Sequence, residues 1–228
     1  MKELIKVFLV SLWLIILAGA ASAAPEAMTD QQKRSYAIGA NVGRNLKQQG
    51  VAVDPELIAR GVVEEMSGKS QLTDAEVAAL MQQFQSEVKQ KKEADRKKAA
   101  EENKQRGAVF QAEYAKKEGV KTLTGGILYR VLQEGTGDKP TAAEYVRCNY
   151  RGTLVDGTQF DASPPGKLAT FNMDKIIRGW QIALREMPAG SKWELVMPPE
   201  MAYGERGAAP GIGPNETLVF EVELVDFE

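Results

Sequence analysis

The sequence contains no histidine and only one cysteine, Cys148. Histidine is the commonest general base and the commonest metal ligand, so its absence excludes hydrolases that use a Ser-His-Asp or Cys-His arrangement. A single cysteine cannot form a disulfide within its own chain, and it cannot supply a zinc site of the CxxC kind. We therefore expect no metal site, and any activity must proceed without a histidine-assisted nucleophile.

A strong charge of either sign is also missing. The 228 residues include 29 Lys and Arg against 31 Asp and Glu, which gives a formal net charge of −2. The chain therefore lacks the global basic field that attracts nucleic acid, and no nucleic-acid partner is expected. A chain of this length has room for one large domain or two small ones.

The N-terminus lacks an apolar run of the ~20 residues that span a bilayer. The shorter run from Val7 to Leu17 follows a start made basic by Lys2 and Lys6. Ala21-Ser22-Ala23 then offers the small-residue site that signal peptidases cut. We expect residues 1–23 to be removed after Ala23, and the protein to reach the periplasm without a stable membrane anchor. An uncleaved anchor is the alternative.

The first half of the mature chain is expected to be helical, because it contains three helix-start signals. Thr29 and Thr73 each precede a glutamine or glutamate by three residues, the spacing of a capping box. Asp54-Pro55 places an N-cap residue before a proline at the first helical position. We assign residues 24–72 to a helical N-terminal domain and residues 73–118 to one long helix.

The long helix has an apolar face only near its start. Five residues at helical spacing form this face: Val77, Leu80, Met81, Phe84 and Val88. Residues 89–103 consist almost wholly of charged residues, amides and alanine, and their alternating charges favour a solvated helix over a nucleic-acid or membrane patch. A helix from Asp74 to Lys117 would extend about 66 Å. We interpret it as a spacer with dimer contacts at its start.

The first two predicted helices are short and rich in small residues, so they can bury little surface on their own. We therefore expect them to pack against a second copy of the chain with two-fold symmetry, which makes the protein a homodimer. A surface that binds another partner is the alternative use of the same apolar residues.

From residue 119 onward the pattern changes to short strands separated by turns. Val146, Cys148 and Tyr150 alternate with polar residues, and Asp156-Gly157 is typical of a hairpin turn. One short helix is expected, with Asp174 as its cap. The fold class is therefore α+β, in which residues 119–228 form a curved antiparallel sheet wrapped over one helix.

Four stretches of this second half resemble the motifs of FKBP domains and follow the order of that family. They are residues 150–163 (YRGTLVDGTQFDAS), Ile176 to Trp180 (IIRGW), Pro199 to Gly204 and Thr217 to Leu224 (TLVFEVEL). Residues 35–39, with Gly61, Leu72 and Phe84, resemble the N-terminal domain of bacterial Mip-like and FkpA-like members. The resemblance implies a peptidyl-prolyl cis/trans isomerase that needs no cofactor and acts on proline-containing unfolded or partly folded polypeptides.

The resemblance also implies an aromatic pocket for the proline ring, with Trp180 as its floor. Its walls and apolar lining would be Tyr150, Phe160, Phe220, Ile176, Ile177 and Ile212. Asp161 and Tyr203 would be the polar members, and Tyr203 and the backbone N–H of Ile177 would bond ligand carbonyls. By themselves Trp180 and Phe220 are typical core residues, and only the joint spacing of the motifs favours a binding site.

Several positions depart from the family pattern. The run after Asp161 lacks an arginine that would pair with the aspartate, and Lys167 does not have the forked geometry of arginine. Ala169 and Gly213 stand where some members carry larger side chains, and the loop from Gly204 to Pro214 has no histidine. The family's macrolide inhibitors are expected ligands, and these departures bear on their affinity.

Rotation about an X-Pro bond needs no nucleophile, which agrees with the lack of histidine. A site accelerates the rotation when it binds the twisted amide better than either planar isomer. Two alternative functions are a chaperone that holds unfolded chains between the two subunits of a dimer, and a scaffold whose pocket is no longer functional. We predict an isomerase that assists protein folding and has added chaperone activity.

Overall fold

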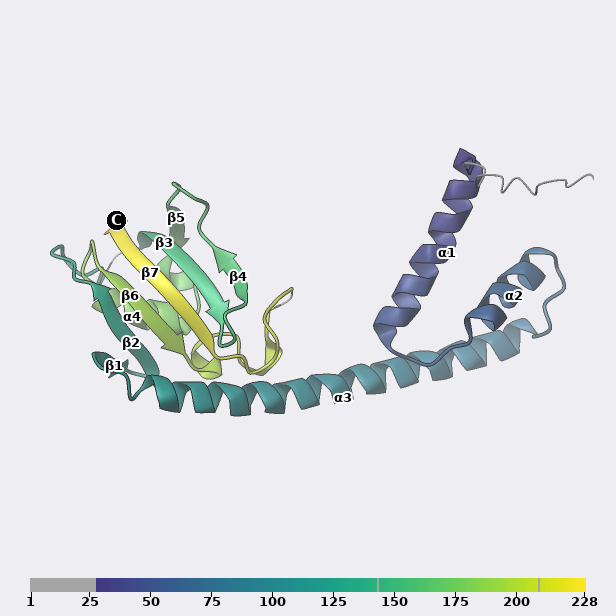
Figure 1. The fold of residues 1–228 in the computed structure, drawn as a ribbon, viewed down its shortest axis with the longest axis horizontal. Helices are drawn as coiled ribbons and strands as arrows, with labels where there is room; N and C mark the ends of the chain where they lie inside the picture. Colours follow the sequence, from purple (N-terminus) through teal and green to yellow (C-terminus); the bar gives the residue numbers. More distant parts are fainter. Residues whose placement is uncertain (1–27, 143, 209) are drawn as a thin grey trace, which may run out of the picture. The chain divides into compact units, whose positions relative to one another are not determined.

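The structure is a computed structural model and describes residues 28–142, 144–208 and 210–228. The predicted signal peptide and its cleavage site lie outside the described residues. The described part of the chain divides into two compact units, and the boundary lies between Ser70 and Gln71 (Figure 1). Within the described part of the chain, every helix is too short or too polar to cross a membrane.

The first unit contains helices α1 (Asp30–Gln49) and α2 (Pro55–Met66). The Thr29 hydroxyl accepts a bond from the backbone N–H of Gln32, and the Gln32 side chain accepts one from the backbone N–H of Thr29. Asp54 caps α2 by accepting bonds from the first N–H groups of that helix. Both predicted helix starts are confirmed. Neither helix contains a buried residue, so their apolar side chains form no core of their own.

The second unit begins with the long helix α3 (Asp74–Tyr114), which starts at the predicted capping box of Thr73 and Glu76. The helix ends at Tyr114, a few residues before the expected end. Asn103, Gly107 and Tyr114 are buried. The last part of α3 therefore packs against the β domain, and the expectation of a solvated spacer as far as residue 118 is wrong for this part.

Seven strands form one antiparallel sheet in the order β1-β2-β6-β7-β3-β4, and β5 pairs with β3. Their bounds are β1 Val120–Leu123, β2 Ile127–Gln133, β3 Tyr145–Leu154, β4 Gln159–Ala162, β5 Ala169–Asn172, β6 Lys192–Met197 and β7 Leu218–Phe227. The predicted curved antiparallel sheet is confirmed (Figure 1). Strand β1 was not predicted, because its polar residues Lys121 and Thr122 leave only Val120 and Leu123 as apolar positions.

Each face of the sheet is covered by a different helix. The short helix α4 (Arg178–Glu186) packs on one face, where Trp180 and Leu184 join a core that includes Leu195 of β6. The next residue, Val196, points to the opposite face, because successive side chains of a strand alternate. There it packs with Tyr114 at the end of α3. The sheet is therefore closed over α4 as predicted, and α3 covers its other side.

The start of α4 differs from the prediction. Asp174 lies in a 3-10 turn, η1 (Met173–Lys175), and its backbone N–H is bonded by the side chain of Asn172. The α-helix itself begins at Arg178, without a side-chain cap. Asp174 therefore does not cap α4, because the chain makes a separate turn first.

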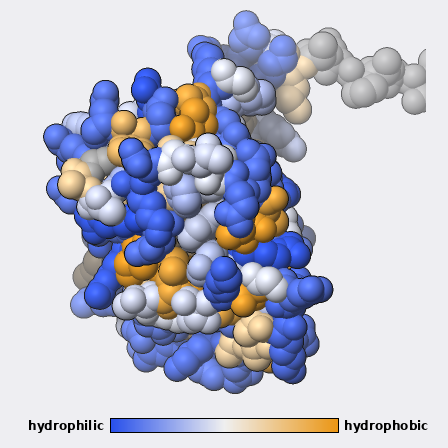
Figure 2. Space-filling model, turned by 90° about the vertical axis from the view of Figure 1, so that its left-hand side faces the viewer, coloured by the Kyte–Doolittle hydropathy of each residue, from blue (hydrophilic) through white to orange (hydrophobic). Residues whose placement is uncertain are grey.

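The face of the molecule in Figure 2 is mostly hydrophilic, and its hydrophobic side chains lie in small separate groups. This is the usual surface of a domain whose large apolar residues are in its core. The largest fully buried side chains of the described residues all belong to the second unit, and they include Ile127, Leu195 and Leu224.

Candidate active site

Strand β3 brings three distant segments of the sequence together. Gly152 of β3 lies opposite Phe220 of β7 and also opposite Asp161 of β4. Tyr150 shares the face of Gly152, because residues two apart in a strand point the same way. The motifs at 150–163 and 217–224 therefore meet at one place in the sheet.

Five aromatic side chains form a cluster around Trp180, which lies in the first turn of α4. The Trp180 ring lies edge-to-face with three rings, at centroid distances of 5.4 Å to Tyr150, 5.2 Å to Phe171 and 5.4 Å to Phe220. Phe160 lies 5.6 Å from Phe220. Such pairs each contribute about 0.5–1.5 kcal/mol beyond their burial, so the arrangement of the rings is strongly fixed.

The exposure of the rings increases from the core to the surface end of the cluster. Trp180 and Phe220 are each only 4% exposed, whereas Tyr150 and Phe160 are half-buried. Ile176, Ile177 and Ile212 are also partly buried and pack against the same core. The cluster is therefore a section of the core that reaches the surface.

Close approach at Gly152 allows this cluster to form. A Cβ at this position would lie 2.6 Å from the ring of Phe160 and 2.9 Å from the ring of Phe220. Carbon atoms do not approach so closely, and any larger residue would displace both rings. The glycine of the 150–163 motif thus has a direct packing reason.

The polar edge of the cluster is built around Asp161. The hydroxyl of Tyr150 donates to one carboxylate oxygen of Asp161 at 2.8 Å, and the backbone N–H of Ala162 donates to the other at 2.9 Å. Among the described residues no cation forms an ion pair with Asp161, and Lys167 is no exception. The phenol of Tyr150 thus holds the carboxylate of Asp161.

Two tyrosines near Asp161 remain protonated over the physiological range. Burial, followed by the hydrogen bond to Asp161 and by its charge, raises the pKa of Tyr150. Burial and then the charge of Asp161 also raise the pKa of Tyr203, although Tyr203 is 39% exposed. The phenol of Tyr203 is therefore available as a hydrogen-bond donor at neutral pH, whereas that of Tyr150 already donates to Asp161.

Two family profiles and many known proteins match this chain. Residues 31–131 match the domain amino terminal to FKBP-type peptidyl-prolyl isomerase, and residues 137–225 match FKBP-type peptidyl-prolyl cis-trans isomerase. The outer membrane protein MIP of Legionella longbeachae is 42% identical over 210 residues, which cover 91% of this chain and 90% of that protein. The chain belongs to the FKBP-type peptidyl-prolyl cis-trans isomerases.

Other relatives agree with this FKBP assignment. FkpA of Escherichia coli K12 is 41% identical over 205 residues, which cover 86% of this chain and 76% of FkpA. A crystal structure of FkpA from Escherichia coli covers 88% of this chain and 97% of its own, with a TM-score of 0.71 and 39% identity. A 1.6 Å crystal structure of a peptidyl-prolyl cis-trans isomerase from Pseudomonas syringae covers 57% of this chain and 96% of its own. Its TM-score is 0.53 and its sequence identity is 43%.

The family, the fold class and the isomerase activity predicted from the motifs are therefore confirmed. The FKBP-type isomerase is similar to the Mip and FkpA proteins over most of its length. The roles of individual site residues remain predictions, because the comparisons identify the family and not the function of each side chain.

The structure brings most of the predicted site residues of this isomerase into one place. Direct ring contacts or hydrogen bonds join Tyr150, Phe160, Asp161, Trp180 and Phe220. One member of the cluster was missed, since Phe171 contacts both Tyr150 and Trp180. Its alternation with Ala169 in the short strand β5 was the available signal, but four residues made that signal weak.

Proposed function

We propose that the aromatic cluster is the place where this FKBP-type isomerase binds and rotates X-Pro bonds. The observation that supports it best is the convergence of five rings from four strands and one helix around Trp180. A purely structural core would enclose all of its rings, whereas this cluster reaches the surface beside a carboxylate and two phenols. Apolar surfaces with a few polar groups at the rim are typical of ligand sites.

The proposed mechanism lowers the barrier of ~18–20 kcal/mol that amide resonance imposes. Trp180, Phe160 and Phe220 contact the proline ring and hold it while the preceding carbonyl turns. An apolar contact surface disfavours the more polar planar amide, because the twisted amide has lost its conjugation. The site therefore binds the twisted form better than either planar isomer, which is the condition for catalysis.

The polar rim positions the turning carbonyl. Tyr203 donates its phenolic hydrogen to that carbonyl, and the backbone N–H of Ile177 bonds a neighbouring one. Asp161 keeps its position through the bond from Tyr150, so that its negative charge stays at the rim. A hydrogen bond formed in the twisted state is worth about 1 kcal/mol, or roughly a fivefold change in rate.

Isomerisation of an X-Pro tetrapeptide by the mature chain, alongside Trp180→Ala and Asp161→Ala, tests this assignment. We expect both variants to lose most of the catalysis while circular dichroism shows that they remain folded. Folded variants that catalyse as fast as the wild type would show that the cluster is not the site. A proline-limited refolding protein, used as a second substrate, extends the test to polypeptides.

We also propose that the cluster binds macrolide inhibitors, with an affinity set by the Tyr150–Asp161 bond. That bond holds the carboxylate of Asp161 at the rim of the cluster. Isothermal titration calorimetry of the wild type and Tyr150→Phe with a macrolide measures whether the bond affects inhibitor affinity. Equal affinities would show that the bond has no part in inhibitor binding.

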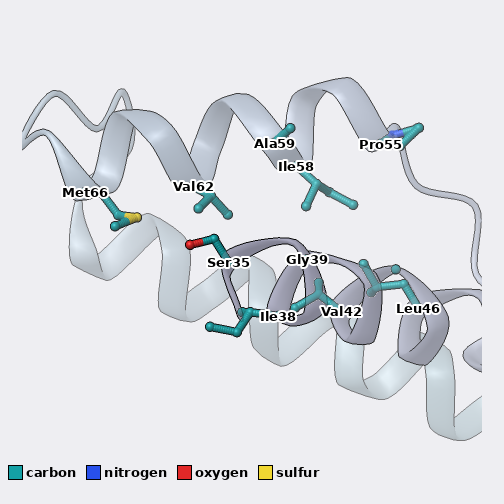
Figure 3. A pocket seen from close by; sticks show the side chains of 11 residues that line it. Ser35, Ile38, Gly39, Val42, Leu46, Pro55, Ile58, Ala59, Val62 and Met66 are labelled. Atoms are coloured by element: carbon teal, nitrogen blue, oxygen red, sulfur yellow. The ribbon is translucent and has the colours of Figure 1, made fainter. Parts of the chain in front are cut away.

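A second function, binding of another chain, is proposed for the first unit. A hollow of about 530 Å³ lies between α1 and α2, lined by the apolar residues Ile38, Val42, Leu46, Ile58, Val62 and Met66. In Figure 3 the side chains of Ile58 and Val62 point from α2 towards α1. Ile38 is 68% exposed and Met66 is 85% exposed. We propose that a second copy covers this surface and that residues 24–72, with the start of the 73–118 helix, form the homodimer.

Chaperone activity would use the same first unit, with helices α1 and α2, and would be separable from isomerisation. Trp180→Ala alters only the aromatic cluster of the 119–228 domain, so it leaves the first unit unchanged. We expect this variant to lose isomerisation but to keep suppressing aggregation. The client for this assay is an unfolding protein whose folding is not limited by proline isomerisation. Loss of both activities together would place client binding in the isomerase domain.

Export to the periplasm is proposed from the N-terminal pattern of basic start, apolar run and small residues. The printed name of the Legionella relative, an outer membrane protein, supports a place in the cell envelope. N-terminal sequencing of the protein recovered from cells is expected to begin at Ala24. A sequence that begins at Met1 would contradict cleavage.

A further inference from the structure

The end of α3 contacts the segment that carries two of the proposed site residues. This segment, the connection from Tyr203 to Thr217, leads into β7 and contains Ile212; the structure describes all of it except residue 209. Its two limbs are held together by a pair of backbone bonds of 2.9 Å between Ala208 and Ile212. These bonds lie within the connection, so they do not fix its position on the domain.

Hydrogen bonds from one side of α3 anchor the connection along its length. The guanidinium of Arg96 donates to the backbone oxygen of Glu205 at 2.8 Å. The side-chain amide of Asn103 donates to the backbone oxygen of Pro214 at 2.8 Å. Further along the helix, Gln111 donates to the hydroxyl of Thr217 at 3.0 Å.

Asn103 is the buried centre of this contact, with only 7% of its surface exposed. Its amide oxygen accepts a bond from Arg106 at 2.8 Å, and Arg106 forms an ion pair of 3.1 Å with Glu216, which is also 7% exposed. The arginine can only donate, so it fixes the amide with its nitrogen towards Pro214. The nitrogen and the oxygen of the Asn103 amide thus each have a partner, as a buried polar group requires.

Close packing supports the same contact. A Cβ at Gly107 would lie 2.2 Å from the hydroxyl of Thr217, so the helix backbone rests directly on the end of the connection. Thr217 is buried and immediately precedes β7. The helix and the connection therefore form one packed element, and neither can shift without disturbing the other.

We infer that α3 positions the active-site connection of the isomerase and that Asn103 is the positioning residue. Asn103 holds the backbone oxygen of Pro214, two residues after Ile212. The next residue, Asn215, donates its backbone N–H to Gly204, which follows Tyr203. The inference rests on the site proposed for Tyr203 and Ile212. Its consequence is that catalysis by the β domain depends on a helix that lies within the amino-terminal family match of residues 31–131.

Asn103→Asp tests the inference in the full mature chain. The change keeps the shape and the oxygen that accepts from Arg106, but it places a carboxylate oxygen against the backbone oxygen of Pro214. We expect kcat/KM for an X-Pro tetrapeptide to fall at least fivefold. Amide hydrogen exchange at Ile212 is expected to speed up at least tenfold, with that of Val222 in β7 unchanged.

Two control variants separate positioning from general loss of stability. Lys98→Gln removes a cation that pairs with Glu102 on the same helix, and it should change neither measurement. Tyr114→Phe removes the bond from the helix end to Glu194, so it should lower stability without lowering kcat/KM or exposing Ile212. If Asn103→Asp folds poorly, Arg96→Gln tests the exposed anchor, with an expected twofold loss of kcat/KM.

The outcomes are distinct. Unchanged kcat/KM in folded Asn103→Asp would overturn the inference, and so would an equal loss in Tyr114→Phe. Tyr203→Phe and Ile212→Ala are measured beside them. If those two catalyse normally, the proposed site is wrong and the inference falls with it; if they lose catalysis while Asn103→Asp does not, the site stands and only the positioning role is lost.

Discussion

The two units of the molecule use apolar side chains in opposite ways. In the second unit they fill both faces of a sheet, and residues such as Leu195 and Val222 are fully buried. In the first unit no residue of α1 or α2 is buried, and Ile38 and Met66 are largely exposed. A domain gains stability only from the apolar surface that it removes from water. The second unit can therefore stabilise itself, whereas the apolar side chains of the first remain exposed to water.

The largest effect is expected when charges are introduced on the exposed apolar surface of the first unit. Ile38→Asp together with Val62→Asp places charges on the surface proposed for the second copy. We expect the homodimer to dissociate with at least a hundredfold weaker affinity, because buried unpaired charges are strongly unfavourable. Sedimentation velocity measures the change, and tetrapeptide isomerisation should stay within twofold of the wild type. Gln48→Glu, at an exposed polar position of α1, is the control; a double variant that remains dimeric would contradict the proposed interface.

The next effect compares one glycine from each unit. At Gly152 an added methyl group would displace the rings of Phe160 and Phe220, so Gly152→Ala should lower kcat/KM at least tenfold. Overpacking of this kind also costs about 1–3 kcal/mol of stability. At Gly61 in α2 nothing lies within 4 Å of the new carbon, and Gly61→Ala should stabilise the helix by about 0.5–1 kcal/mol. Urea unfolding and the tetrapeptide assay measure both variants, and a silent Gly152→Ala would contradict the packing argument.

A smaller effect is expected from single phenolic hydroxyl groups. Tyr150→Phe removes the bond to Asp161 and should lower kcat/KM about fivefold, since one such bond is worth about 1 kcal/mol. Tyr36→Phe in α1 is the matched change in the other unit, where the side chain is exposed, and it should leave catalysis unchanged. Equal activity of the two variants would show that the position of Asp161 is not set by Tyr150.

The smallest effect concerns stability at alkaline pH. Burial and the neighbouring Glu194 raise the pKa of Tyr114 above the ordinary value of about 10. The unfolded chain therefore loses this proton first, so the contribution of Tyr114 to the free energy of unfolding is unchanged below about pH 9 and falls as pH rises above 10. The wild type should lose about 0.8 kcal/mol more than Tyr114→Phe between pH 8 and pH 10.5. Denaturant unfolding at both values checks the difference, and parallel losses would show that Tyr114 titrates normally.

Much of the isomerase domain could be predicted because its signals are local. Alternating residues marked β3 and β7, Asp156-Gly157 marked a hairpin, and the spacing of four motifs identified the family. The helix starts at Thr29, Asp54 and Thr73 were equally clear, because a cap bonds backbone groups two or three residues away. Asp174 was misread for a related reason, since its capping signal belongs to a short turn that precedes α4.

The charged end of α3 shows what local patterns omit. Its sequence is typical of a solvated helix, and no periodic apolar stripe predicts the contact with the connection. The contact instead depends on Asn103, Gly107 and Gln111, small or polar residues that match the shape and bonding groups of a loop about 110 positions later.

The sequence by itself determined the family, the chemistry without histidine, the helix starts at Thr29, Asp54 and Thr73, and most strands of the catalytic domain. These follow from hydrogen bonds and side-chain periodicity over a few neighbouring residues. Only the tertiary structure decided that Phe171 joins the cluster around Trp180, that Tyr150 holds Asp161, and that α3 rests on the connection through Asn103. Such contacts join residues far apart in the chain, and their geometry exists only once the sheet has folded.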